Sequence, residues 1–591
     1  MPQAKFRPLA THAGLDLAMD VCLFVGLALG LGCYLVLGMD PAFLPVEGAT
    51  APLKPTAASF LLNAIPVALV AILLLVVTRR GLLSLSIAVA LVFALYAANE
   101  IKLELLDTPL LPGDFQLLAH LGDGGALLAR YLTPAQLAWS AGIALAWLLL
   151  LLFERPWQDL SGRRRLALLV AVLLVNGGLF LNMRPWSTVY AAHLDRFETW
   201  SPSVSMSRNG LIVTLLNYSW RVRHPAMAVD REAAARVLRN HPLPPAMADP
   251  TEWPDIIVLQ SESLFDLERL SGIDDGATLP HLRRLMAEHR HGDLWVPTYG
   301  GGTIRTEFEV LTGLAMREFP DVEYPYFSLT TSNAVPSLPG LLREKGYRTI
   351  AMHPNARDFW NRAVAFEHLG FDEFDAAERF AGARRVGYYI SDEELVERML
   401  ARLNESPGPT FLFAISMENH GPYDNYPNAD PARLAAQPVP DGLSGVPAAR
   451  LRGYSYHAEN ADRELGRLVD ALRARSRPSL LLFYGDHLPA LPAVYAELGF
   501  DDGAEGPAQP VPWLLVDSRR SVAQVAAEPT ASFYLPALLL DAAGIDDRGY
   551  FRLLESLRRA DAPQRDWTPA ESEGMRAVMH LRHGDRFSIE P

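Results

Sequence analysis

Four side chains suited to metal-assisted chemistry follow separate apolar stretches of the chain. Glu262 comes shortly after the run DIIVLQ, Thr303 lies in GGGTIRTEFE, and Asp486 and His487 follow LLLFYG. Carboxylates and an imidazole can bind one divalent cation, and such a cation lowers the pKa of a nearby hydroxyl so that it can act as a nucleophile. The four residues therefore predict one metal site with Thr303 as the reacting group.

The adjacent Asp486 and His487 are the strongest of these signals, because both can bend toward one ion after the glycine that ends their strand. Taken alone, Glu262 could be a metal ligand or simply a carboxylate at a helix N-terminus, which is common. Thr303 is either a helix N-cap or a nucleophile. The three glycines before Thr303 permit positive φ and a close approach of the backbone to a ligand, but they lack the Lys-Ser/Thr ending of a nucleotide P-loop.

Further polar residues follow other apolar runs. His353 lies in AMHPNARDFWNR and His420 in ISMENHGPY. A single histidine is usually structural or solvated, whereas several at strand ends favour one anion-binding site. Arg305 either faces a phosphate or pairs with Glu307 or Glu309.

These residues are positioned by alternating strand and helix patterns, which begin at Asp255. Short β-branched runs predict strands at Ile256–Leu259, Thr349–Met352, Thr410–Ile415, Leu480–Tyr484 and Trp513–Val516. Helical periodicity predicts helices at Leu279–His289, Thr306–Leu314, Val335–Lys345, Ser391–Leu403, Ala458–Arg473 and Ser532–Ala543. This alternation indicates an α/β domain with a mostly parallel sheet, which binds ligands beyond the carboxyl ends of its strands.

The composition divides the 591 residues into an apolar first third and an ordinary globular remainder. The net charge of −14 and the lack of a concentrated basic patch argue against a nucleic-acid partner. The 2 cysteines, Cys22 and Cys33, both lie in the first apolar stretch. Disulfides, cysteine metal ligands and a cysteine nucleophile are therefore excluded from the remainder.

Apolar stretches of the length that crosses a bilayer, about 20 residues, occur in the first third. They predict a five-helix transmembrane domain over residues 1–184, with spans near Val21–Gly38, Phe60–Thr78, Leu82–Asn99, Pro134–Phe153 and Leu166–Met183. The first stretch does not resemble a cleaved signal peptide, because Asp16 and Asp20 precede it.

Lysines and arginines predict the orientation of these spans. They precede the first span and lie between the second and third and between the fourth and fifth, whereas the other loops carry mainly acids. The positive-inside rule then places the N-terminus in the cytoplasm and everything after Met183 outside it. Leu106–Leu118, within the 100–132 loop, is apolar enough to lie in the membrane interface.

Residues 185–250 are expected to join the membrane domain to a catalytic domain over 251–591. Within the joining segment, NGLIVTLLNYSWRV predicts a short helix, either amphipathic and lying on the bilayer or a simple connector.

The order of Glu262, Thr303 before TEFEVLTG, HPNARDFWNR, NHGPY and YGDH resembles that of the lipoteichoic acid synthase-like phosphoglycerol transferases. These enzymes belong to the alkaline phosphatase/sulfatase superfamily, and the resemblance covers about residues 250–545 and the membrane spans. It implies that Glu262, Thr303, Asp486 and His487 hold one Mn²⁺ or Mg²⁺ ion. It also implies that Thr303 is the nucleophile and that His353, Trp360, Arg362 and His420 contact the substrate.

The neighbours of Thr303 depart from the lipoteichoic acid synthases, since Gly302 and Ile304-Arg305 replace more polar residues. In this respect the chain looks closer to relatives that decorate periplasmic glucans. The resemblance implies transfer of phosphoglycerol from phosphatidylglycerol to an extracytoplasmic glycan or polymer, with release of diacylglycerol. Mn²⁺ is the expected metal, and the ligand set also tolerates Mg²⁺ or Zn²⁺.

Two other functions remain open at this stage, and a third is excluded. A phosphoethanolamine transferase shares the fold and the threonine, but its Asp-His motif continues with Gly-Glu-Ser rather than Leu-Pro. A sulfatase needs a C/S-x-P-x-R motif, which is absent. The second function that remains open is a non-catalytic membrane sensor. The sequence leaves open the acceptor, the oligomeric state, and whether hydrolysis or transfer dominates. The Arg- and Ala-rich composition favours the inner membrane of a bacterium with a periplasm.

Overall fold

The computed structural model divides the chain into two compact units, residues 1–104 with 108–225 and residues 105–107 with 226–591. The ranges that it describes are 12–40, 57–106, 109–115, 153–157, 162–193, 202–222, 230–241, 250–273, 278–319, 324–330, 335–423, 426–520, 526–547, 549–560 and 569–583, with a few single residues between them.

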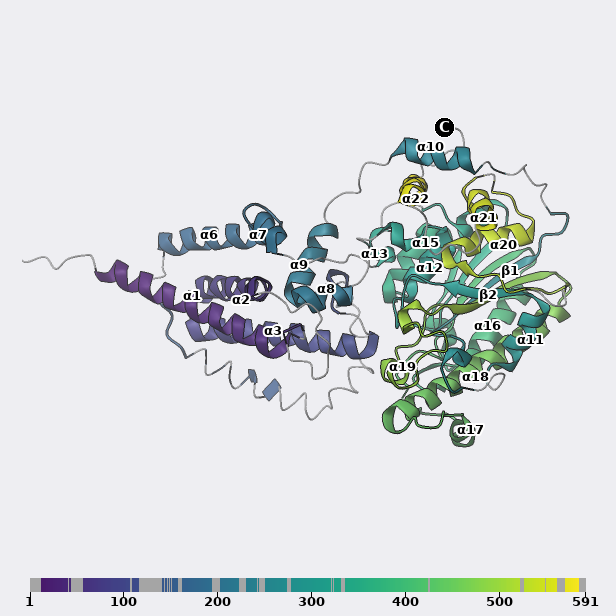
Figure 1. Cartoon of the computed structure of the whole chain (residues 1–591), viewed down its shortest axis with the longest axis horizontal. Helices are drawn as coiled ribbons and strands as arrows, with labels where there is room; N and C mark the ends of the chain where they lie inside the picture. Colours follow the sequence, from purple (N-terminus) through teal and green to yellow (C-terminus); the bar gives the residue numbers. More distant parts are fainter. Residues whose placement is uncertain are drawn as a thin grey trace, which may run out of the picture. The chain divides into compact units, whose positions relative to one another are not determined.

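The first unit is helical. Its helices are α1 (His12–Met39), α2 (Ala57–Thr78), α3 (Gly81–Leu106), α6 (Gly162–Phe180), α7 (Trp186–His193), α8 (Pro202–Asn209) and α9 (Leu211–Val222). Figure 1 shows α1, α2 and α3 as the long helices of this unit. Their described residues are long and apolar enough to cross a membrane, over Asp20–Met39, Ala58–Thr78 and Gly81–Leu103.

The predicted count of five spans is not confirmed. The fourth stretch, Pro134–Phe153, lies mostly outside the described residues. The fifth forms α6, but three arginines, Arg163 to Arg165, occupy its first turn. Its uncharged part runs only from Leu166 to Phe180, which is shorter than the roughly 20 residues that a span needs.

Helix α9 packs inside the first unit, where its residues from Leu211 to Val213 are buried, as are Leu216 and Trp220. Tyr190 and residues of α2 and α3 belong to the same core. A helix that lies on a bilayer leaves its polar face exposed to water. Of the two predicted alternatives, the buried surface of α9 favours a connector helix over a helix lying on the membrane surface.

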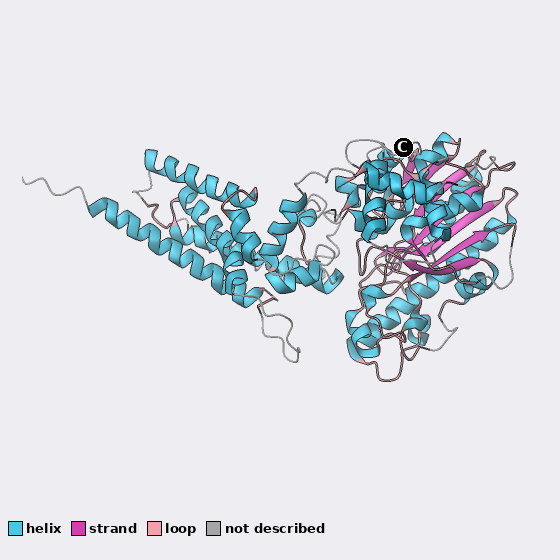
Figure 2. Cartoon of the chain, turned by 45° about the horizontal axis from the view of Figure 1, so that its top comes forward, coloured by secondary structure: helices cyan, strands magenta, loops and turns pink. Residues whose placement is uncertain are grey.

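The second unit holds an eight-stranded sheet in the order β10-β2-β9-β8-β1-β7-β3-β4, and Figure 2 shows helices on both of its faces. The strands are β1 (Asp255–Ser261), β2 (Arg290–Trp295), β3 (Arg348–Met352), β4 (Glu373–Asp375), β7 (Thr410–Ile415), β8 (Ser479–Gly485), β9 (Val511–Asp517) and β10 (Thr530–Ala531). Neighbours from β8 to β4 pair in parallel, whereas β9 is antiparallel to both β8 and β2. The predicted mostly parallel sheet is confirmed.

The helices of this unit include all those predicted from periodicity. They are α10 (Arg231–Asn240), α11 (Pro280–Glu288), α12 (Thr303–Thr312), α13 (Pro325–Ser328), α14 (Leu338–Glu344), α15 (Arg362–Leu369), α16 (Asp392–Glu405), α17 (Pro431–Ala436), α18 (Gly445–Ala474), α19 (Pro492–Leu498), α20 (Leu535–Ala543), α21 (Tyr550–Ala560) and α22 (Pro569–His583). The short strands β5 (Arg385–Val386) and β6 (Tyr389–Ile390) form a separate hairpin. Helix α10 packs against α22, so the end of the expected joining segment belongs to this unit.

The central strands β1, β7 and β8 are buried along their whole length. Strands covered on both faces bury continuous apolar runs, which is why the sequence patterns of these three are so regular. Their carboxyl ends meet at one edge of the sheet, because β1 pairs with β7 and β8 in parallel. The residues after these strands are thereby brought together.

Candidate active site

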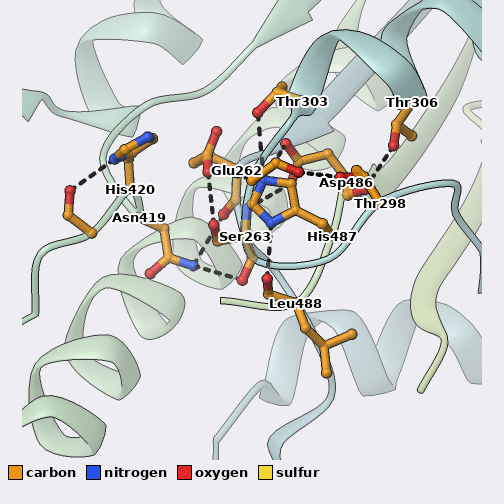
Figure 3. Close-up of polar contacts among 12 residues, drawn as sticks. Glu262, Ser263, Thr298, Thr303, Thr306, Asn419, His420, Asp486, His487 and Leu488 are labelled. Carbon is orange, nitrogen blue, oxygen red and sulfur yellow. Dashed lines mark hydrogen bonds and ion pairs between the residues drawn. The ribbon is translucent and has the colours of Figure 1, made fainter. Parts of the chain in front are cut away.

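Glu262, Asp486 and His487 converge beyond the ends of β1 and β8, and each of their side chains is almost fully buried. One ligand atom from each lies within 4.8 Å of those of the other two. His487 Nε2 is 3.6 Å from Glu262 Oε1 and 3.4 Å from Asp486 Oδ2. Figure 3 shows the three side chains pointing toward one another.

Thr303 is the first residue of α12 and faces this cluster (Figure 3). Its Oγ1 lies 3.4 Å from His487 Nε2. The residue before it, Gly302, has a φ of 76°, and a Cβ there would come within 2.8 Å of Thr298 Oγ1. Gly302, not Thr303, therefore occupies the cap position, and the threonine hydroxyl is directed to the site instead of to its own helix.

A second glycine brings the two strand ends together. A Cβ on Gly485 would lie 2.0 Å from Leu264 O, so only glycine lets the chain after β1 pass so close to β8. The loop is then held by hydrogen bonds, in which Ser263 N donates to Asp486 Oδ1 at 2.7 Å and Ser263 Oγ donates to Glu262 Oε1 at 2.7 Å. Asn419 Nδ2 donates to Glu262 O at 3.1 Å.

The chemistry of this cluster fits a bound cation. His487 Nδ1 lies 2.9 Å from Leu488 O, a pure acceptor, so Nδ1 carries the proton and Nε2 presents its lone pair to the site. Asp486 Oδ2 is buried and has no hydrogen-bond partner. Burial, and after it the negative charge of Glu262, raise the pKa of Asp486 well above its usual value. Three such acceptors that face one another are stabilised when a divalent cation lies between them.

The predicted substrate residues lie on other elements of the same unit. Arg362 begins α15, is fully buried, and forms an ion pair with Glu307. His353 follows β3 and is 1% exposed, with its Nε2 unpartnered. Burial, then the nearby charge of Arg362, hold the pKa of His353 well below its usual range. His353 is therefore neutral at physiological pH.

His420 is half-buried and its Nδ1 lies 2.8 Å from Gly421 O. The ring of Tyr389, on β6, is 5.1 Å from the His420 ring. Burial, and then the charge of Glu262, raise the pKa of the Tyr389 hydroxyl, which indicates that Tyr389 also lies close to the acidic cluster.

Trp360 is half-buried, with its ring centre 4.9 Å from that of Tyr324. Arg305 Nη1 donates to Val322 O at 3.0 Å. Glu307 forms its ion pair with Arg362. Glu309 accepts hydrogen bonds from Ser532 Oγ and from Met316 N, and the charge of Arg305 also acts on it, so a pairing of Arg305 with Glu309 stays a prediction. The contacts of Ser263, Glu307 and Tyr389 could not be predicted from local sequence, because their partners lie far away in the chain.

The sequence model of the sulfatase family matches residues 254–545. This segment is a sulfatase/alkaline phosphatase superfamily domain. It contains every one of the residues that converge on the cluster described above. The superfamily resemblance inferred from the sequence is therefore confirmed.

Two curated relatives point in the same direction. A Rhizobium meliloti protein whose name links it to cyclic beta-1,2-glucan modification is 28% identical over 418 residues, which cover 68% of this chain and 63% of the relative. The lipoteichoic acid synthase of Staphylococcus saprophyticus is 27% identical over 168 residues, which cover 27% of this chain and 24% of the synthase. The chain thus spans less than two thirds of the length of each.

Among solved structures, the phosphoglycerol transferase GacH of Streptococcus pyogenes, bound to sn-glycerol-1-phosphate, superposes with a TM-score of 0.50. The superposition covers 62% of this chain and 98% of GacH, at 19% identity. At that identity the similarity establishes the fold of the second unit.

Proposed function

We propose that this chain is a phosphoglycerol transferase that takes its donor group from phosphatidylglycerol and passes it to a glycan or polymer acceptor outside the cytoplasm. The observation that carries the proposal is the direction of Thr303, whose hydroxyl faces a buried cluster made only of acceptors. The names of the glucan-modification and lipoteichoic acid relatives support the donor and acceptor classes.

Glu262, Asp486 and His487, with Thr303 beside them, are the residues that would hold one divalent cation, and we propose Mn²⁺. Such an ion, when bound, supplies positive charge that lowers the pKa of the threonine hydroxyl and offsets the charge of a phosphate. The hydrogen bond that His487 Nδ1 donates to Leu488 O keeps Nε2 directed at the site. Metal-binding histidines commonly have such a bond on the other ring nitrogen.

In the first step, Thr303 Oγ1 forms a bond to the phosphorus of the donor while the bond between phosphorus and the diacylglycerol oxygen breaks. The leaving oxygen needs a proton. His353 is unsuited to supply it, because its pKa is held low, and because its Nδ1 lies 3.4 Å from the acceptor Ile415 O, so that Nδ1 carries the ring proton and Nε2 is left as an acceptor. The half-buried His420 is therefore the proposed acid, and His353 Nε2 is free to accept a hydrogen bond from a substrate hydroxyl.

In the second step, an acceptor hydroxyl attacks the phosphoryl group on Thr303, the bond from phosphorus to the threonine oxygen breaks, and the hydroxyl of Thr303 is restored. Arg362 and Trp360 are the proposed contacts to the phosphoglycerol group, with Arg305 nearby at the start of α12. Both steps use one site, so the kinetics are expected to be ping-pong.

The apolar helices of the first unit associate the chain with a membrane. We propose that it is a multi-pass protein of the bacterial cytoplasmic membrane, with residues 251–591 on the outer side. This placement keeps the site close to a donor that stays in the bilayer.

The deciding experiment measures diacylglycerol release by the full chain in vesicles that contain labelled phosphatidylglycerol or phosphatidylethanolamine, with Mn²⁺ present. Release from phosphatidylglycerol only is expected. Release of diacylglycerol from phosphatidylethanolamine alone would identify the protein as a phosphoethanolamine transferase. Release from neither lipid would indicate a non-catalytic role. Adding a glucan acceptor and following the label then separates transfer from hydrolysis.

A further inference from the structure

Arg362 is held in a way that its predicted role does not explain. Its side chain is 1% exposed and that of Glu307 is 0% exposed. Arg362 Nε donates to Glu307 Oε2 at 3.1 Å, and Nη2 donates to Glu307 Oε1. Two parallel hydrogen bonds of this kind fix both the position and the plane of a guanidinium group.

Glu307 belongs to the helix that presents the proposed nucleophile. Thr303 begins α12 and Glu307 follows four residues later, so both side chains lie on the same face of that helix. Tyr326 Oη donates to Glu307 Oε2 at 3.1 Å, which fixes the carboxylate from a further side. The distance from Thr303 to Arg362 is thus set by one turn of a buried helix and one bidentate ion pair.

The backbone before Arg362 is fixed as well. Trp360 and Asn361 both have a φ of 60°, and Asn361 Nδ2 donates to Tyr326 O at 2.7 Å. Tyr326 thus binds Glu307 through its hydroxyl and the segment before Arg362 through its carbonyl. The position of Arg362 is therefore fixed both by the ion pair of its side chain with Glu307 and by the hydrogen bond of the preceding residue, Asn361, with Tyr326.

The ion pair also borders the reacting groups. Burial, and after it the charge of Arg362, lowers the pKa of His353, and Thr306, the residue before Glu307, donates from Oγ1 to Asp486 O at 2.9 Å. Arg362 Nη1 has only a long contact, 3.4 Å, to Phe359 O. An unpaired arginine would repel a cation held by Asp486, whereas the Glu307–Arg362 pair is neutral as a whole.

We propose that Glu307 is a positioning residue, which anchors the Arg362 guanidinium at a fixed distance from Thr303 so that a phosphate group fits between them. The inference rests on the proposed function. Fixing the guanidinium before the substrate arrives removes the cost of ordering it during the reaction.

The test is a double-mutant cycle on the full chain in phosphatidylglycerol vesicles at saturating Mn²⁺, with Glu307→Gln, Arg362→Gln and the double variant. Glu307→Gln is expected to lower kcat about 10- to 100-fold, the range for losing hydrogen bonds to a charged group. In the Arg362→Gln background the same change is expected to have no further effect on kcat, because the proposed effect of Glu307 on the rate is its hold on the Arg362 guanidinium.

Two further variants separate positioning from folding and from charge. Glu309→Gln changes another buried glutamate of α12, one that binds Ser532 and Met316 instead, and is expected to leave kcat unchanged. Glu307→Asp keeps the charge but shortens the side chain, and is expected to lower kcat with little change in melting temperature. It also replaces Glu307→Gln in the cycle if that variant does not fold.

The proposal is overturned if folded Glu307→Gln and Glu307→Asp both keep the wild-type kcat, or if the effects of Glu307→Gln and Arg362→Gln multiply in the double variant. It is also overturned if Arg362→Gln keeps the wild-type rate, an outcome that leaves the proposed function intact. Diacylglycerol release by the wild-type chain tests that function separately.

Discussion

The two units of this protein each bury a carboxylate among other polar groups, and they satisfy it differently. In the first unit, Asp40 accepts hydrogen bonds from Tyr96 Oη at 2.9 Å, from Leu211 N at 2.8 Å and from Ala42 N at 3.1 Å. In the second unit, Asp486 accepts one from Ser263 N, while its other oxygen faces Glu262 and His487 without a hydrogen-bond partner.

The surroundings of Asp40 explain the difference. Its partner Leu211 is the first residue of α9, whose N-terminal amides need acceptors. Asn63 Oδ1 accepts from Val213 N at 3.0 Å and completes the same helix start. Asp40 and Asn63 thus hold a helix in place, and both carboxylate oxygens of Asp40 accept hydrogen bonds in doing so.

The comparison shows that the groups around a buried carboxylate distinguish a structural role from a functional one. A buried acid surrounded by donors stabilises the fold. A buried acid surrounded by acceptors is costly until a positive ligand arrives. Substitutions at the two carboxylates should therefore have different consequences.

The largest effect is expected from Thr303→Ala. Removal of the attacking oxygen should lower the rate of diacylglycerol release at least ~1,000-fold. The melting temperature should stay close to that of the wild type, because the Thr303 hydroxyl contacts side chains of the proposed metal site, His487 Nε2 at 3.4 Å and the Asp486 carboxylate. Thr303→Ser is the matched control and should keep part of the activity. Activity in Thr303→Ala would rule out the threonine as nucleophile.

The second largest effect is expected from metal removal, which should change the second unit and leave the first unit unchanged. A chelator is expected to stop turnover and to lower the melting temperature of the second unit, and Mn²⁺ at about 100 times its Kd should restore about 2.7 kcal/mol of stability. In Asp486→Asn the Mn²⁺-dependent rise in melting temperature should disappear. A chelator-insensitive rate, or an unchanged Mn²⁺ response in Asp486→Asn, would contradict the metal assignment.

Asp40→Ala is expected to act on the first unit alone. It leaves the amide of Leu211 and the hydroxyl of Tyr96 without their acceptor, at a cost of about 1–3 kcal/mol for each buried group left unpaired. Mn²⁺ affinity, measured by calorimetry, should not change. Asp20→Ala, at an exposed position of α1, is the matched control and should leave the stability unchanged. A loss of Mn²⁺ binding in Asp40→Ala would contradict the separation of the two carboxylates.

The smallest effect is a dependence of stability on pH. Because burial and Glu262 raise the pKa of Asp486, the folded metal-free protein binds a proton more tightly than the unfolded chain does. Its stability should therefore fall as the pH rises from about 4, with a slope of at most about 1.4 kcal/mol per pH unit. Mn²⁺ affinity should rise over the same range, since the ion competes with that proton.

Chemical denaturation at several pH values with a chelator present measures this slope, and Asp486→Asn should reduce it. An equal slope in the variant would assign the pH dependence to another group, such as Glu309, whose pKa burial raises to about 7.

Much of the second unit could be predicted because its strands are buried on both faces. The runs at Ile256–Leu259 and Leu480–Tyr484 fall within β1 and β8 as observed. The antiparallel orientation of β9 could not be predicted. Backbone hydrogen bonds join strands in either orientation, and the side chains of one strand do not specify which orientation it takes. β2 was missed because its pattern RHGDLW has few apolar residues.

The residue types that follow the buried strands, and therefore the kind of chemistry, can be read from the local pattern, because a carboxylate or imidazole after an apolar run is conspicuous there. How these groups face one another, and which glutamate binds Arg362, follows from the folded arrangement of the chain. Those relations join residues far apart in the chain, and local sequence carries no record of the distance between them.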